Sequence, residues 1–208
     1  MRVRPVTPTA LVEELAERIA ATRREGWVRV AVDGPPAADP DRLADALVDP
    51  IRVRGRAALR VSTRDYLRPA SLRLERGRTD PDVFYEDWLD VGGLTREVLG
   101  PLSPGGTGRV LPALWNAETD RATRASYVQL PAGGVLLLSG PLLLGRGLPL
   151  DLTIHLALSP GALSRRTPAD QRWTLPAYER YAREVAPETH ADVVVRIDDP
   201  RHPAVVEA

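Results

Sequence analysis

The sequence predicts one α/β domain, in which a parallel sheet is covered by helices on both faces. Short apolar segments with strand periodicity alternate with segments of helical periodicity, which is the pattern of parallel sheets. The chain has 208 residues, of which 43% are hydrophobic, and this is enough to bury the core of one domain without disulfides or metals. The whole chain, residues 1–208, is therefore expected to form a single domain.

The first elements of the chain are a helix, a strand and a second helix. Thr7 is a capping residue followed by Pro8, and the apolar residues after it have helical spacing, so a helix is expected within residues 1–26. Alternating valines predict a strand over residues 27–33. A tight loop rich in proline leads to a second helix, which is expected over residues 41–48.

The rest of the chain repeats this alternation less regularly. A helix is expected over residues 81–99, with a weak middle at Gly92 and Gly93. The composition of residues 102–108 predicts a surface turn. Further strands are expected at residues 57–62, 135–138, 151–158 and 191–197.

Composition and charge exclude several classes of function. The 28 basic residues balance 28 acidic residues, and this zero net charge argues against nucleic-acid binding. Every basic residue is Arg, so lysine-dependent chemistry is excluded. Cys is absent and the 3 His lack metal-ligand spacing, so no metal site is expected, and His155 is expected to be a buried, hydrogen-bonded strand residue. The longest uncharged stretch, residues 125–145, is broken by Pro and Gly, so a cytoplasmic protein without a membrane segment is expected.

The loop after the first predicted strand is the first candidate for chemistry, because ligands of parallel α/β sheets bind at the carboxyl ends of strands. On the phosphate-loop pattern G-x-x-x-x-G-K-[ST], Gly34 matches the first glycine. Asp39, Pro40 and Asp41 stand where Gly, Lys and Ser or Thr belong. Proline donates no N–H, and carboxylates repel phosphate oxygens. The structural alternative is that Asp39 caps the following helix.

Six segments, in this order, resemble uridine kinase-like proteins of the actinobacterial type. The segments are VAVDGPPAADPDRLADAL, VSTRDYLRP, LRLERGRTDPDVFYEDWLD, VLLLSG, LTIHLALSP and ADVVVRIDDP. The resemblance covers nearly all of residues 27–203 and is most specific over residues 72–90. It implies a P-loop nucleoside kinase fold, with Mg-ATP on the phosphate loop, an acidic base after the second strand and an arginine-bearing lid.

Several residues depart from what this resemblance implies. Arg64 stands where the family has its catalytic Asp, and a guanidinium cannot accept a proton, so the neighbouring Asp65 is the other catalytic candidate. Ser139 replaces the family's acidic residue before Gly140. The implied nucleoside-pocket candidates are Tyr66, Arg78, Asp80 and Tyr85. The implied lid candidates are Arg165, Arg166 and Arg172, in a shortened lid-like segment over residues 164–190.

These departures predict a uridine kinase-like protein with a degenerate phosphate loop (Walker A motif). It is expected to have lost ATP-dependent phosphoryl transfer, to need no cofactor, and to act as a binding or regulatory pseudokinase. One alternative is an active nucleoside or small-molecule kinase that uses Mg-ATP through an atypical phosphate site. That site would be rebuilt from Arg64, Arg165, Arg166 or Arg172, with Asp33 or Asp65 as the acid. Another alternative is a different reaction in the same pocket. The expected partners are a nucleoside or small anionic ligand and a protein or second copy of the chain, not nucleic acid or a membrane.

Overall fold

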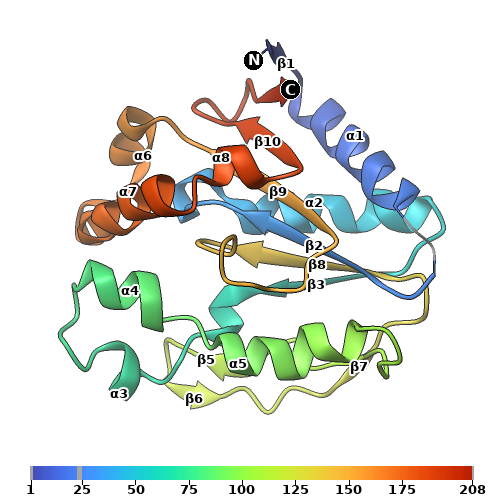
Figure 1. The fold of residues 1–208 in the computed structure, drawn as a ribbon, viewed down its shortest axis with the longest axis horizontal. Helices are drawn as coiled ribbons and strands as arrows, with labels where there is room; N and C mark the ends of the chain where they lie inside the picture. Colours follow the sequence, from blue (N-terminus) through green and yellow to red (C-terminus); the bar gives the residue numbers. More distant parts are fainter. Residues whose placement is uncertain (1, 23–24, 208) are drawn as a thin grey trace.

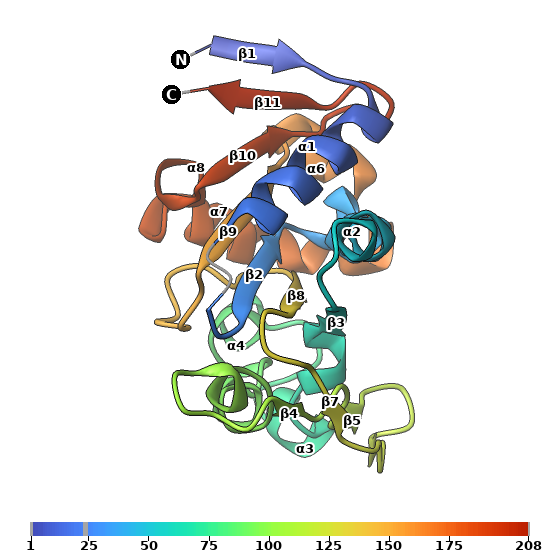
Figure 2. The ribbon, with the colours of Figure 1, turned by 90° about the vertical axis from the view of Figure 1, so that its right-hand side faces the viewer.

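The central sheet has seven strands in the order β1-β11-β10-β9-β2-β8-β3. The structure, a computed structural model, describes residues 2–22 and 25–207. Two strands at one edge, β1 (Arg2–Pro5) and β11 (Ala204–Glu207), are antiparallel to their neighbours, and Figure 2 shows this edge beside the two termini. The five parallel strands are β2 (Val28–Asp33), β3 (Ala58–Ser62), β8 (Val135–Gly140), β9 (Leu152–Ala157) and β10 (Val193–Arg196).

The parallel part of the sheet confirms the predicted fold class, and all five parallel strands were expected from the sequence. The two antiparallel strands, β1 and β11, were not expected from the sequence. β1 is only four residues long and contains one Val among two Arg and a Pro, so its periodicity carries little information. Long-range pairing defines it, with help from an ion pair between Arg4 Nε and Glu207 at 2.9 Å.

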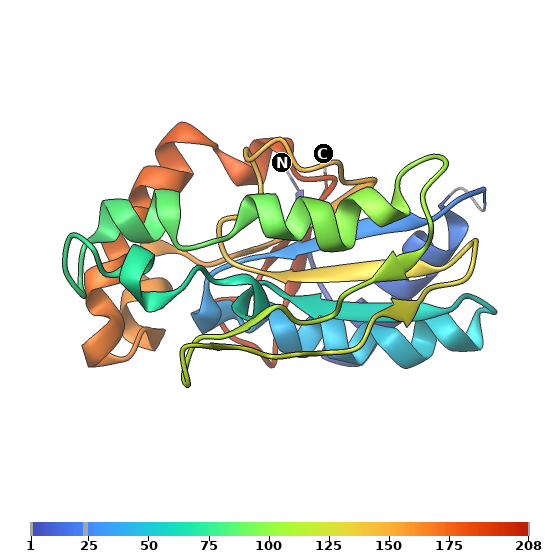
Figure 3. The same ribbon diagram turned by 90° about the horizontal axis from the view of Figure 1, so that it is seen from below.

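Two long helices cover one face of the sheet. In α1 (Pro8–Ala21) the Thr7 side chain accepts a hydrogen bond from the Ala10 N–H, as the predicted cap requires. The second helix, α2 (Pro40–Val53), continues past its predicted end because Ile51 extends the buried stripe by another turn. α2 packs on β2 and β8, α1 packs beside α2, and the buried side chains of both helices share one apolar cluster with alternate residues of these strands. Figure 3 shows the strands between α2 and the helical run of residues 91–102 on the other face.

The segment predicted as one helix over residues 81–99 is broken. α4 (Pro81–Asp87) ends before Trp88, and a new helix, α5, spans Val91–Leu94. Asp90 is its N-cap, and the Asp90 carboxylate accepts from the Gly93 N–H at 2.8 Å. The break therefore precedes the two glycines that were expected to weaken the helix. Gly93 has a packing reason, because a Cβ there would lie 2.5 Å from Asp90 Oδ2. A π-helical turn over Thr95–Leu99 and a 3-10 turn over Gly100–Leu102 continue the run.

The other elements lie around this core. The segment of residues 102–108 forms the turn that its composition predicts, closed by a hydrogen bond from the Gly106 N–H to the Ser103 carbonyl at 2.8 Å. No helix within the described ranges is long and apolar enough to cross a membrane. The short helices are α3 (Ala70–Arg73), α6 (Pro160–Arg166) and α8 (Pro187–His190), and α7 (Leu175–Glu184) is longer. Two small ribbons pair β4 (Arg109–Val110) with β7 (Val128–Gln129) and β5 (Trp115–Asn116) with β6 (Arg121–Ala122).

Candidate functional site

The candidate site lies at the carboxyl ends of the parallel strands, where α/β proteins bind their ligands. In Figure 1 the arrowhead of β8 points toward this end of the sheet, and α4, α6 and α7 lie around it. Residues 34–39 leave β2 here and residues 63–66 leave β3. Gly140 ends β8 so close to Thr63 that a Cβ would lie 1.8 Å from the Thr63 hydroxyl oxygen, so only glycine fits.

The loop between β2 and α2 directs several of its N–H groups inward. The Gly34 N–H donates to the Gly140 carbonyl at 3.2 Å, and the N–H groups of Ala38 and Asp39 donate to carbonyls within the loop at 2.8 and 3.0 Å. Three further positions, at residues 35, 36 and 40, are prolines and have no N–H. A phosphate loop binds anions through convergent free N–H groups, and this loop offers few of them.

Asp39 caps α2, as the structural interpretation of the loop predicts. Its Oδ1 accepts a hydrogen bond from the Arg42 N–H at 3.3 Å. Its backbone lies in the left-handed region, at φ 57° and ψ 57°, which glycine adopts freely and aspartate tolerates. The phosphate-loop pattern has its second glycine at this position. An acidic side chain therefore occupies a backbone position that glycine adopts most freely.

A cavity of about 550 Å³ opens beside this loop. We call it the aromatic pocket, and its main lining residues are Arg64, Phe84, Trp88, Arg166, Trp173 and Tyr178. The Phe84 ring makes edge contacts with the rings of Trp88, Trp173 and Tyr178, with centroids 5.1, 5.6 and 5.9 Å apart. The charged side chains of its described lining are those of Arg64 and Arg166. Flat apolar surfaces and positive charge therefore meet in one cavity.

The four nucleoside-pocket candidates lie away from the lining of the aromatic pocket. Tyr66 is fully buried and donates to the Leu111 carbonyl at 2.5 Å, and its burial holds its pKa above the usual range. Tyr85 packs under the Arg180 guanidinium, which lies 4.5 Å from the ring centroid. Asp80 caps α4, and Arg78 is exposed in the preceding loop. Phe84 and Trp88 line the pocket, and Phe84 also packs against the hydrophobic core.

The lid candidates do not act as a group. Arg166 lines the aromatic pocket, and its Nη1 donates to the Ile197 carbonyl at 2.7 Å. Arg165, at the end of α6, and Arg172, in a 3-10 turn over Ala169–Thr174, are exposed. The predicted lid segment, residues 164–190, contains this turn, α7 and α8.

Asp41 and Ser139, which the sequence presents as separate departures, are in direct contact. The Ser139 hydroxyl donates to Asp41 Oδ1 at 2.5 Å, and the Ser62 hydroxyl lies 3.1 and 3.2 Å from the two carboxylate oxygens. The same carboxylate lies 3.3 Å from Arg60 Nη2 and 3.7 Å from Arg64 Nε. Two hydroxyls and two guanidiniums therefore surround one carboxylate at the start of α2.

Comparison with known proteins bears on the fold. No protein-family model matches the sequence, and no curated protein matches it. Among solved structures, the chain is similar to a possible uridine kinase from Bacillus stearothermophilus, with a TM-score of 0.73, 18% identity, and coverage of 89% of this chain and 97% of that one. It is also similar to a candidate fructose transport system kinase from a Silicibacter species (TM-score 0.59, 23% identity, coverage 85% and 88%) and to D-glycerate 3-kinase from Cryptococcus neoformans (0.52, 15%, 85% and 78%).

This chain shares the α/β fold of these kinases. In P-loop enzymes a hydroxyl at the start of the helix and a carboxylate at the end of a neighbouring strand hold Mg²⁺ together. In this chain the helix carries the carboxylate of Asp41 and β8 carries the hydroxyl of Ser139, which is the reverse of that arrangement. The sequence analysis names both residues but not the contact between them. The contact could have been suspected, because the hydroxyl missing from position 41 stands at position 139 and the carboxylate missing from position 139 stands at position 41.

The pair of Asp41 and Ser139 does not fit a divalent cation. Mg²⁺ takes oxygen ligands in near-octahedral geometry, but both Asp41 oxygens already contact hydroxyls or guanidiniums. The positive charges of Arg60 and Arg64 would also repel a metal cation placed between them and Asp41. Across the described part of the chain, no group of three or more His, Asp and Glu residues could hold a metal ion.

Asp65 and Arg64, the two catalytic candidates, differ in environment. Arg64 lines the aromatic pocket with a side chain that is 71% exposed. Burial raises the pKa of the Asp65 carboxyl above its usual value, and the nearby Arg60 and Arg64 charges oppose this shift. The raised pKa makes Asp65 the better proton acceptor of the two, whereas Arg64 is placed to contact an anion.

Proposed function

We propose that this protein has a P-loop kinase fold but has lost ATP-dependent phosphoryl transfer and needs no Mg-ATP. It binds a nucleoside or a small anionic ligand in the aromatic pocket. Its role is that of a regulatory pseudokinase. The observation that carries the proposal is the Asp41 carboxylate, paired with Ser62, Ser139, Arg60 and Arg64 where a P-loop kinase places its Mg²⁺.

Charge supports the loss of activity. Phosphoryl transfer depends almost entirely on positioning and neutralising phosphate charge. A carboxylate about 4 Å from a phosphate oxygen repels it by roughly 4 kcal/mol at an effective dielectric near 20. Asp39 and Asp41 would both face such a group, and the chain has no Lys to offset them. The inward hydrogen bonds of the loop remove further donors that ATP would need.

The ligand class follows from the aromatic pocket. Rings of Phe84, Trp88 and Trp173 offer faces and edges against which a planar base can pack. The guanidiniums of Arg64 and Arg166 can donate to a phosphate or carboxylate. A nucleoside monophosphate combines both features in one molecule, and UMP is therefore the probe that we choose.

Two assays test this proposal on the wild-type protein. Incubation with ATP or GTP and uridine or cytidine is expected to give no transfer above a no-enzyme control. Calorimetric titration is expected to show UMP binding without Mg²⁺ and no binding of Mg-ATP. Arg64→Gln should weaken UMP binding about tenfold, because it removes a charged hydrogen-bond donor. The matched control is Arg172→Gln, which removes an exposed guanidinium outside the lining.

The pKa of Asp65 favours one alternative, an active kinase with an atypical phosphate site. A carboxyl with a raised pKa is suited to accept the proton of a substrate hydroxyl. Turnover with ATP that is abolished by Asp65→Asn but retained in the folded Asp80→Asn variant would support this alternative and contradict the loss of activity.

A further inference from the structure

A second site is built around a buried carboxylate that the proposed function does not use. Asp33, at the end of β2, is fully buried, and its Oδ1 accepts from the Leu143 N–H at 2.9 Å. Its Oδ2 accepts from the Tyr181 hydroxyl at 3.0 Å and lies 2.6 Å from His155 Nδ1. Burial holds the pKa of Tyr181 far above its usual range, so this hydroxyl stays protonated and donates.

These contacts orient the imidazole of His155. A carboxylate at 2.6 Å accepts a hydrogen bond, so a hydrogen is assigned to Nδ1, and in the tautomer that carries its hydrogen there the lone pair lies on Nε2. Within the described residues, Nε2 has no hydrogen-bond partner, and it is not among the buried unpaired atoms. The ring therefore offers an acceptor to a molecule outside the protein core.

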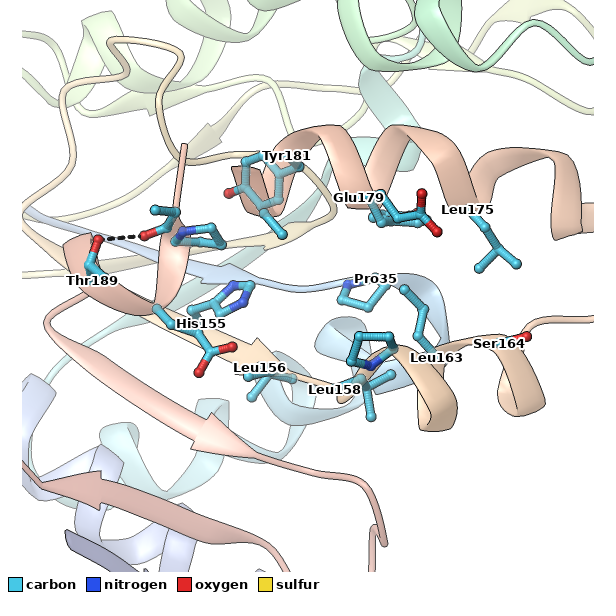
Figure 4. A pocket seen from close by; sticks show the side chains of 17 residues that line it. Pro35, His155, Leu156, Leu158, Leu163, Ser164, Leu175, Glu179, Tyr181 and Thr189 are labelled. Carbon is cyan, nitrogen blue, oxygen red and sulfur yellow. Dashed lines mark hydrogen bonds between the residues drawn. The ribbon is translucent and has the colours of Figure 1, made fainter. Parts of the chain in front are cut away.

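The imidazole faces a cavity of about 380 Å³, which we call the histidine pocket. In Figure 4 the His155 ring points from β9 into the space beneath α7, which carries Leu175, Glu179 and Tyr181. Most of the lining is apolar, and it includes Leu156, Leu158, Leu163, Leu175, Ala182 and Pro187. This volume is within the range of small-molecule sites, about 300–1,000 Å³.

The charges of the histidine pocket are opposite to those of the aromatic pocket. Its described lining contains two carboxylates, Glu179 and Glu188, and no arginine. Pro35 and Tyr178 line both cavities and form a shared wall. The two sites are therefore neighbours, but an anion that suits one is repelled from the other.

We propose that the histidine pocket is a second ligand site, and that it binds a small apolar amine whose ammonium group donates a hydrogen bond to His155 Nε2. The apolar walls take the hydrocarbon part of the molecule. Glu179 favours its positive charge over a neutral or anionic molecule of the same shape, whereas the charge of Glu188 is partly offset by Arg196 at 3.7 Å. Because the anionic ligand of the aromatic pocket uses other residues, this site does not depend on the proposed function.

The test uses 3-phenylpropylamine as the probe and 3-phenylpropanoate as the matched anion, each titrated into the wild-type protein by calorimetry. The amine is expected to bind at least about tenfold more tightly than the carboxylate. Its addition should also shift the His155 Nε2 and Hε1 signals in a long-range ¹⁵N–¹H NMR spectrum. Carboxylate binding as tight as amine binding, or no shift at His155, would overturn the proposal.

Variants locate the binding within the pocket. In His155→Asn the amide nitrogen can replace Nδ1 as the donor to Asp33, while the acceptor toward the pocket is lost, so amine affinity should fall about fivefold to tenfold. Ala182→Trp fills the pocket and should abolish binding. Arg172→Gln removes an exposed guanidinium outside both linings and should leave amine affinity unchanged. Unchanged amine affinity in Ala182→Trp, or in a folded His155→Asn, would contradict amine binding in the histidine pocket. If His155→Asn does not fold, the NMR shift of His155 in the wild type tests the contact with Nε2.

Discussion

Two carboxylates lie at the two ends of the same loop and are stabilised in different ways. Asp33, before the loop, is completely buried, with an N–H, a hydroxyl and an imidazole as partners. Asp41, after the loop, has a side chain that is 24% exposed, and its partners include the two guanidiniums of Arg60 and Arg64. Each carboxylate also contacts a side chain that lines a different pocket. Asp33 contacts His155 of the histidine pocket, and Asp41 lies 3.7 Å from Arg64 of the aromatic pocket.

The difference shows what each position requires of the fold. Removing a buried acceptor leaves its donors without water or protein partners, which is costly. Removing a partly exposed carboxylate mainly changes the local charge, because water can solvate the remaining arginines. We therefore expect substitutions at Asp33 to affect stability first, and substitutions at Asp41 to affect anion binding first.

The largest expected effect tests the buried end of this comparison. Asp33→Ala leaves the Leu143 N–H, the Tyr181 hydroxyl and His155 Nδ1 without their acceptor, and should lower the free energy of unfolding by about 3 to 5 kcal/mol. Asp33→Asn keeps one acceptor oxygen and should cost less. Urea denaturation monitored by tryptophan fluorescence measures both variants. A loss below about 1 kcal/mol in Asp33→Ala would show that the cluster is not structurally required.

The next effect tests whether Asp41 and Ser139 act as a pair. Asp41→Ser and Ser139→Asp each place two like groups in contact, whereas the double variant restores one hydroxyl and one carboxylate in reversed positions. A double-mutant cycle should therefore give a coupling energy of about 2 kcal/mol in favour of the double variant.

The double variant also tests the link between this pair and the cation. Adding Asp39→Gly and Pro40→Lys to it restores all four defining positions of the phosphate-loop pattern. This quadruple variant should bind Mg-ATP in a calorimetric titration, while Arg64 keeps catalysis absent. A folded quadruple variant without affinity for Mg-ATP would show that the loop backbone, and not its side chains, excludes the nucleotide.

A smaller effect is expected at Asp39, between the two carboxylates. Asp39→Ala removes the acceptor of the Arg42 N–H at the start of α2 and places Ala in the left-handed region, so it should cost about 1 to 2 kcal/mol. Asp39→Asn should cost little, because Asn caps helices nearly as well and tolerates the left-handed backbone. Denaturation with and without Mg²⁺ distinguishes capping from metal binding, since stabilisation by Mg²⁺ in the wild type alone would contradict the capping role.

Much of the fold could be predicted because its signals are local. The valines of β2 and the apolar run of β8 are buried parallel strands, and such strands are recognisable from a few residues. The edge strand β1 could not be predicted, because it is defined by pairing with residues 204–207 at the far end of the chain. The helix break before Val91 depends on the Asp90 side chain and a bridge between Leu67 and Leu89, which periodicity does not report.

The candidate site was predictable in its position and less so in its details. The loop after β2 and the cap at Asp39 follow from residue types in sequence order. The contact between Asp41 and Ser139 joins residues 98 positions apart, and only the sheet register brings them together. His155 was expected to be buried and hydrogen-bonded, as it is, but its partner Asp33 and the cavity beside it depend on how α7 packs.

The smallest expected effect concerns Asp65, whose carboxyl lies near Asp41 but has no cationic partner in direct contact within the described ion pairs. Because burial raises its pKa, the folded protein binds this proton more tightly than the unfolded chain does. The carboxyl therefore destabilises the fold progressively as the pH rises from the unfolded pKa through the folded pKa. Asp65→Asn removes this penalty, so its unfolding midpoint in urea should exceed that of the wild type at about pH 7 and converge with it at about pH 3. A wild type that is more stable than Asp65→Asn at about pH 7 and loses this advantage as the pH falls would instead show that Asp65 is stabilised as a carboxylate, and would contradict the raised pKa.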